Sequence, residues 1–194
     1  TKLLAMPTPG LSLAVDLSGS VTRGLFQFNN VLYAVKDNKF YSIDTSFTAT
    51  ERGTLNTSTG IVHMACNGTE IIIVDGTTGY IFTIASSGFA QISDPDFPAN
   101  PITCTYQDGY FFVNTTQYTY ASDLLAGTVW SALSFASAES DPDALVAVIS
   151  DHRELIMFGK NTTEFFYNNA GANFPFTRNT GAYLQKGCLA PHSV

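Results

Sequence analysis

The sequence predicts an all-β protein, a β-propeller made of four-stranded antiparallel blades. Short apolar runs separated by tight polar turns recur at intervals of about 40 residues, the length of a propeller blade. Several of the turns are Asn-Gly or Asp-Gly pairs between β-branched and aromatic runs, which is a strong hairpin signal. The chain of 194 residues is 45% hydrophobic and 13% aromatic, so it can bury a large core between blades.

Four repeats share the same layout of three strands and two turns. The first turns begin at Asn29, Asn67, Gln107 and Asp151. The predicted strands are, in chain order, 24–28, 31–35 and 40–43; 62–66, 70–74 and 80–84; 102–106, 110–114 and 118–120; and 145–149, 154–158 and 164–167. The segments that link the repeats can supply a fourth, outer strand, as at 88–92 and 129–135. Four antiparallel strands then make each repeat one blade.

The two ends of the chain are expected to differ from the repeats. Residues 1–20 are predicted to be an N-terminal extension or linker, and residues 21–194 the propeller domain. The last segment, Gly187–Val194, has the pattern of a first blade strand, so we expect about four blades plus the start of another. The chain does not begin with Met, and we expect it to be part of a longer polypeptide. Short helices can be accommodated only at 121–126 and 137–146.

The tetrapeptide Ser-Asp-Pro-Asp occurs twice, at 93–96 and 140–143, each time shortly before the first strand of a repeat. Proline fixes φ and aspartate favours the start of a turn, so we interpret the tetrapeptide as the connection between blades. The alternatives are a calcium site or a glycosidase carboxylate pair. Both are disfavoured, because a proline separates the two acids and no further acids follow nearby.

Charge and composition exclude several classes of function. Lys and Arg number 9 against 16 Asp and Glu, for a net charge of −7, and no basic cluster is present. Tight direct binding of nucleic acid needs clustered Lys and Arg, so it is not expected. The longest apolar runs, such as 71–74, are too short to span a bilayer. No membrane association is therefore expected.

No set of residues has the pattern of a catalytic, metal or cofactor site. Cys66, Cys104 and Cys188 are an odd number at wide spacing without a CxxC pair, so they predict neither disulfides nor zinc. The three histidines share no metal-like spacing. The chain also lacks GxSxG, GxGxxG and P-loop motifs. We predict a protein that is not an enzyme and needs no cofactor.

From Ser93 onward the chain resembles a known family. The similar segments are 93–122, 130–143, 153–165 and 173–193. They resemble the packaged-DNA stabilisation proteins, also called tail hub or tail accessory proteins, of short-tailed phages. The residues that carry the resemblance as a structural motif are Asp94, Pro95, Asp96, Trp130, Glu139, Asp141, Asp143, Gly159, Glu164 and Gly187.

The resemblance implies a virion structural protein that is made in the host cytoplasm and assembled into the phage tail. Members of the family form an oligomeric ring that closes the DNA channel and retains packaged DNA until ejection. The implied partners are other tail proteins, namely the head-to-tail adaptor, a plug or needle, and the tailspike. The main alternative is a carbohydrate- or receptor-binding propeller, and a hydrolase on a propeller scaffold is a further one, because propellers host unrelated functions.

Overall fold

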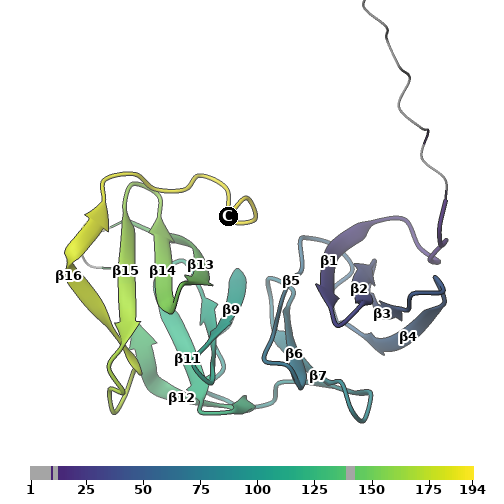
Figure 1. Cartoon of the computed structure of the whole chain (residues 1–194), viewed down its shortest axis with the longest axis horizontal. Helices are drawn as coiled ribbons and strands as arrows, with labels where there is room; N and C mark the ends of the chain where they lie inside the picture. Colours follow the sequence, from purple (N-terminus) through teal and green to yellow (C-terminus); the bar gives the residue numbers. More distant parts are fainter. Residues whose placement is uncertain (1–9, 11–12, 139–142) are drawn as a thin grey trace, which may run out of the picture.

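The computed structural model describes residue 10 and residues 13–138 and 143–194. These residues form sixteen strands, all paired antiparallel, and contain no helix. Each successive group of four strands makes one sheet, with the strands in sequence order across it. The predicted all-β propeller of four-stranded blades is confirmed (Figure 1).

The four blades are numbered here in chain order. Blade 1 contains β1 (Thr22–Phe28), β2 (Val31–Lys36), β3 (Lys39–Ile43) and β4 (Ala49–Thr54). Blade 2 contains β5 (His63–Cys66), β6 (Glu70–Val74), β7 (Gly79–Thr83) and β8 (Gly88–Gln91). Blade 3 contains β9 (Thr103–Gln107), β10 (Tyr110–Asn114), β11 (Thr119–Asp123) and β12 (Ala126–Ala136). Blade 4 contains β13 (Leu145–Asp151), β14 (Glu154–Gly159), β15 (Thr163–Asn168) and β16 (Phe176–Leu184).

The first turns of blades 1 and 3 explain why these hairpins form where the sequence predicts them. Asn29 and Asn30 have φ of 46° and 60°, the left-handed values that a tight two-residue hairpin requires. Asp108 and Gly109 follow the same pattern, with φ of 50° and 95°. Asparagine, aspartate and glycine tolerate these values better than other residues do. The turns therefore fix the register of the strands on either side.

The expected short helix at 121–126 is wrong. Residues 121–123 belong to β11, where Ala121 pairs with Phe112 of β10 and Ser122 and Asp123 pair with Trp130 and Ala126 of β12. The chain then turns at Leu125, which has φ of 56°, into β12. The backbone groups of this segment are used in strand pairing, which leaves them unavailable for the hydrogen bonds of a helix. In the second expected helix, 139–142 lies outside the described residues and Leu145 and Val146 belong to β13.

Three apolar cores hold the blades together, one between each pair of successive blades. Strand β6 of blade 2 contributes side chains to two of these cores. Ile71 and Ile73 face blade 1, whereas Ile72 and Val74 face blade 3. Successive side chains of a strand point to opposite faces of the sheet. A strand buried on both faces is therefore apolar throughout, which is what the run 71–74 displays.

The blades form an arc, from the purple blade 1 to the yellow-green blade 4 (Figure 1). Among the described residues, no apolar core joins blade 4 to blade 1. Residues 187–194, expected to begin a fifth blade, form no paired strand within the described part of the chain. A first blade strand is normally held by the second strand of its own blade, and the described residues beyond blade 4 contain no such partner.

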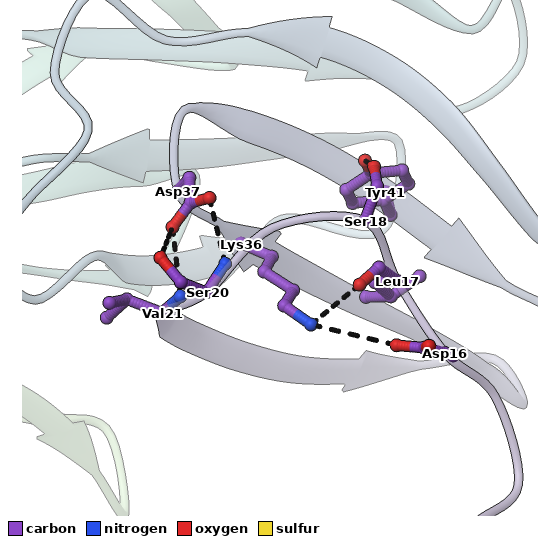
Figure 2. A network of polar contacts seen from close by, with 8 residues as sticks. All are labelled: Asp16, Leu17, Ser18, Ser20, Val21, Lys36, Asp37 and Tyr41. Atoms are coloured by element: carbon purple, nitrogen blue, oxygen red, sulfur yellow. Dashed lines mark hydrogen bonds and ion pairs between the residues drawn. The ribbon is translucent and has the colours of Figure 1, made fainter.

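Part of the predicted N-terminal extension packs on blade 1 (Figure 2). The ammonium of Lys36 donates to the carbonyl oxygen of Leu17 at 2.6 Å. The Asp37 carboxylate accepts bonds from Ser20 and Val21, including the backbone amide of Val21 at 2.9 Å. These hydrogen bonds lower the pKa of Asp37. Residues 16–21, hereafter the strap, thus belong structurally to the first blade.

Candidate functional site

The first Ser-Asp-Pro-Asp copy joins the connector between blades 2 and 3 to the outer strand of blade 3. One carboxylate oxygen of Asp94 accepts a bond from the backbone amide of Asp96 at 2.9 Å, which closes the turn around Pro95. The other oxygen accepts a bond from the backbone amide of Trp130 at 3.1 Å. The ring of Phe97 meets the Trp130 indole edge-on, with centroids 4.9 Å apart. The motif therefore attaches the connector to β12 through the Asp94 carboxylate.

In the second copy, only Asp143 lies within the described residues. Glu139 and Asp141, which the resemblance singled out, lie outside the described residues, together with Ser140 and Pro142. Asp143, the counterpart of Asp96, accepts bonds from the backbone amides of Asn161 and Thr162. It thereby holds the turn between β14 and β15. Among the described residues, Asp94 of the first copy holds the outer strand β12, and Asp143 of the second copy holds the turn between β14 and β15.

Two glycines of the motif lie at this same turn. A side chain at Gly159 would collide with the Asp143 carboxylate, and one at Gly187 would collide with the backbone of Lys160. The backbone amide of Cys188 donates to the Gly159 carbonyl oxygen at 2.9 Å. Three segments far apart in the sequence thus close around one turn, and the absence of a β-carbon is what lets them approach.

Glu164 of the motif is a buried charge at the centre of blade 4. Its side chain is fully buried in β15, and Arg178 of β16 donates to its Oε2 at 3.4 Å. A buried carboxylate persists only when it is paired and hydrogen-bonded. Glu164 therefore ties the outer strand of blade 4 to its neighbour.

The structure also identifies a residue that sequence analysis missed, Arg23 of β1. Its side chain is 4% exposed and lies at the joint between blades 1 and 2. The guanidinium donates to the carbonyl oxygens of Asp37, Thr57, Thr59 and Gly60 and to the Thr57 hydroxyl. A cation at the start of an apolar strand, in a chain with only 9 Lys and Arg, was the available signal.

These residues organise backbone turns and joints, and they do not converge on a reacting centre. Among the described residues, no group of three or more His, Cys, Asp or Glu is placed to hold a metal ion. No helix able to cross a membrane occurs in the described part of the chain. The carboxylates of Asp94 and Asp143 point at backbone amides. The arrangement is suited to rigid packing.

Replacing Asp94 by alanine is expected to lower the free energy of unfolding by about 1–2 kcal/mol, because two backbone amides lose their acceptor. Chemical denaturation measures the change. Asp96→Ala is the matched control, since it removes an exposed carboxylate of the same motif, and its effect is expected to stay below about 0.5 kcal/mol. An equal decrease in the free energy of unfolding for the two variants would contradict the role of Asp94 in attaching the connector to β12.

The inner strands of the blades line a pocket to which the part-buried His63 contributes. His63 of β5 accepts a bond from the backbone amide of Cys104 at 3.3 Å, and its ring lies 6.0 Å from that of His192. Burial, and then the neighbouring His192, lower the pKa of His63 from 6.5 to about 4. Burial likewise lowers the pKa of His192. The neutral form of the His63 ring is therefore favoured at neutral pH.

This histidine makes stability depend on pH. Between about pH 6.5 and pH 4 the unfolded chain binds a proton at His63 more readily than the folded chain does. The free energy of unfolding is therefore expected to decrease as the pH is lowered, by about 2 kcal/mol between pH 7 and pH 5. Denaturation at both pH values measures this. His63→Asn keeps an acceptor for Cys104 without titrating, and an unchanged pH dependence in that variant would contradict the assignment.

Four-stranded antiparallel blades, packed face to face in sequence order around their inner strands, define the class of β-propellers. The chain belongs to the phage stabilisation family, described as Bacteriophage P22 Gp10, beta-propeller, whose family model matches residues 3–194. This match confirms the resemblance seen in the sequence. The chain is accordingly a phage structural protein. No curated protein matches it.

Solved structures support the fold alone, since their sequence identity is low. A chain of the mitotic checkpoint complex is 14% identical, with a TM-score of 0.61 over 94% of this chain and 62% of that one. An extracellular domain of a putative hybrid two-component system from B. thetaiotaomicron is 13% identical, with a TM-score of 0.59 over 84% of this chain and 22% of that one. The computationally designed Ika4 protein is 12% identical, with a TM-score of 0.59 over 80% of this chain and 98% of that one. The chain thus spans less than two thirds of the first two matches.

Proposed function

We propose that the protein is a non-enzymatic part of a phage tail hub that closes the DNA channel and retains packaged DNA. Membership of the phage stabilisation family carries the proposal. The blade joints support it, because their polar residues are engaged in fixing turns and strands. A ring that holds pressurised DNA must be rigid, and buried, closely packed joints between blades provide rigidity.

The proposed setting is the virion, after synthesis in the host cytoplasm. The partners are the adaptor, a plug or needle and the tailspike, with further copies of the protein completing a homo-oligomeric ring. The charge of the chain supports a DNA-repelling channel wall, since 16 Asp and Glu outnumber 9 Lys and Arg. Such a surface lets DNA pass without adhering to it.

The test uses phage particles that are assembled without the protein, and it measures the amount of DNA per purified particle. Heads that fill and then lose their DNA are expected, and wild-type protein supplied in the host should restore retention. A complementing copy that carries Asp96→Ala is the control for expression, since this exposed substitution should leave folding intact. Particles that keep their DNA without the protein would exclude the proposed function.

The carbohydrate-binding alternative has one structural feature in its favour. A cavity of about 350 Å³ between blades 3 and 4 is lined by aromatic rings and one cation, namely Phe135, Phe166, Phe174, Phe176 and Arg178. Trp130, the single tryptophan, is 4% exposed and therefore unable to stack on a sugar. Glycan-array binding that disappears in Phe135→Ala would favour this alternative over the tail hub.

A further inference from the structure

The joint between blades 1 and 2 contains a pocket of about 230 Å³. Tyr33 and Phe82, which are 4% and 2% exposed, close its base, and part-exposed aliphatic side chains add apolar surface, namely Val31 and Ile84. Exposed polar residues from the outer side of blade 1 and from the turn after β7 also line it, namely Asp44, Thr48, Thr50 and Ser87. A concave site with an apolar base and a few converging polar groups is typical of a small-molecule site.

Arg52 of β4 is the cation of this pocket, and two hydroxyls orient its side chain. Its Nε donates to the Ser42 hydroxyl at 2.7 Å and its Nη1 donates to the Ser87 hydroxyl at 3.1 Å, so the guanidinium spans both blades. Within the described part of the chain no ion pair joins Arg52 to a carboxylate, because the adjacent Glu51 pairs with Lys39 instead. The chain has 16 acidic residues and only 9 Lys and Arg. An oriented, part-buried guanidinium without a carboxylate partner can therefore bind an anion from outside the protein.

The other polar groups of the pocket also have unused hydrogen-bonding capacity. The hydroxyls of Tyr33, Thr48 and Thr50 form no hydrogen bond with any residue that the structure describes. One carboxylate oxygen of Asp44 accepts bonds from the backbone amides of Ser46 and Thr48 at 2.9 Å and 2.8 Å. Its other oxygen is bonded to no described residue. Each free hydroxyl can both donate and accept, whereas the free carboxylate oxygen can only accept.

This set of groups selects among small polar ligands. A carboxylate matches Arg52, because Nη2 and the remaining N–H of Nη1 can donate to its two oxygens. A phosphate is disfavoured, since its larger negative charge would lie in the same small pocket as the Asp44 carboxylate. Asp44 instead matches a donor, and the hydroxyls of a sugar ring are donors that can also exchange bonds with Thr48 and Thr50.

We propose that the pocket between blades 1 and 2 binds a single sugar ring that carries a carboxylate. The sugar carboxylate lies on Arg52, and the ring hydroxyls bond to Asp44, Thr48 and Thr50. The site is separate from the cavity between blades 3 and 4. Binding here is a further property of the protein and does not depend on its proposed role in the tail hub.

The test titrates the 15N-labelled protein with two matched pairs of sugars, glucuronate with glucose and galacturonate with galactose. The members of each pair differ in a carboxylate that replaces a hydroxymethyl group. Backbone amide shifts at Thr48 and Ser87 are followed by NMR. At least one of the acids is expected to bind with a Kd of about 1 mM, and at least fivefold more tightly than its neutral partner. Phosphate and glycine serve as a simple anion and a zwitterion, and neither is expected to give saturable shifts.

Three variants connect binding to the proposed groups, and their NMR spectra report whether each is folded. Arg52→Gln keeps an N–H donor but removes the charge, so it is expected to weaken binding of the acid at least tenfold. Thr50→Val removes one exposed hydroxyl and is expected to weaken binding at least threefold, which keeps the test decisive if Arg52→Gln does not fold. Arg153→Gln is the matched control, because Arg153 is an exposed arginine in the turn between β13 and β14, and it is expected to bind as the wild type does.

Four results would overturn the proposal. They are the absence of saturable shifts with both acids, equal affinity for an acid and its neutral partner, binding of phosphate or glycine as tight as that of the sugar acid, and unchanged affinity in a folded Arg52→Gln variant.

Discussion

Replacing Arg23 by alanine is expected to lower the free energy of unfolding by about 3–5 kcal/mol, as measured by chemical denaturation. The guanidinium satisfies four carbonyl oxygens and one hydroxyl, and the side chain is 4% exposed. Its removal leaves four carbonyl oxygens and one hydroxyl without their donor. The nearby Asp75 also loses the positive charge that offsets its own. The joint between blades 1 and 2 is expected to open first.

Two controls separate the geometry of Arg23 from its charge. Arg23→Lys keeps the charge but replaces a planar set of five donors with a single ammonium, so it is expected to recover less than half of the loss. Arg52→Ala removes a partly exposed arginine that donates to the Ser42 and Ser87 hydroxyls, and its loss is expected to stay near 1 kcal/mol. If Arg23→Ala is no less stable than Arg52→Ala, the role assigned to Arg23 is wrong.

Truncating Phe112 to alanine is expected to cost about 3–5 kcal/mol, because a large ring leaves a cavity between blades 3 and 4. The Phe112 side chain is fully buried. Its ring meets those of Phe174 and Phe176 edge-on, with centroids 5.8 Å and 5.0 Å away. These two rings come from the last blade, so the loss should also free blade 4 from the arc. Denaturation together with limited proteolysis of blade 4 measures both effects.

The matched control for Phe112 is Phe47→Ala, which removes the same ring from a position that is 59% exposed. Its effect is expected to stay within about 0.5 kcal/mol. Phe112→Leu should fall between the two, since it retains part of the buried volume. Comparable losses at Phe47 and Phe112 would show that the aromatic joint contributes little.

The hairpins could be predicted from the sequence because their signals are local. Turn residues that accept positive φ, such as Asn29 and Asn30, stand between short apolar runs, and both features are visible within ten residues. The outer strands of blades 1 and 4 gave a weaker signal. β4 contains Glu51 and Arg52, and the nine residues of β16 alternate poorly. Such strands pair on one side only, so packing imposes little on their composition.

The motif residues could be picked out from the sequence, but their contacts could not. Asp94 and Asp143 occupy the same tetrapeptide at different positions, yet one holds Trp130 and the other holds Thr162. These partners lie 36 and 19 residues away along the chain. Arg23 bonds to residues that are 14 to 37 positions away. Contacts at this range depend on how the blades stack, which no local pattern records.

The sequence by itself determined the repeat, the hairpins and the apolar run in the second strand of each blade. Those features arise from backbone preferences and from side-chain alternation within one blade. Only the tertiary structure decided which of the apolar faces are covered. Ile72 and Ile156 occupy equivalent positions in similar runs, but Ile72 is fully buried and Ile156 is part-exposed. Burial of a blade face depends on the neighbouring blade, and that neighbour is a property of the assembled arc.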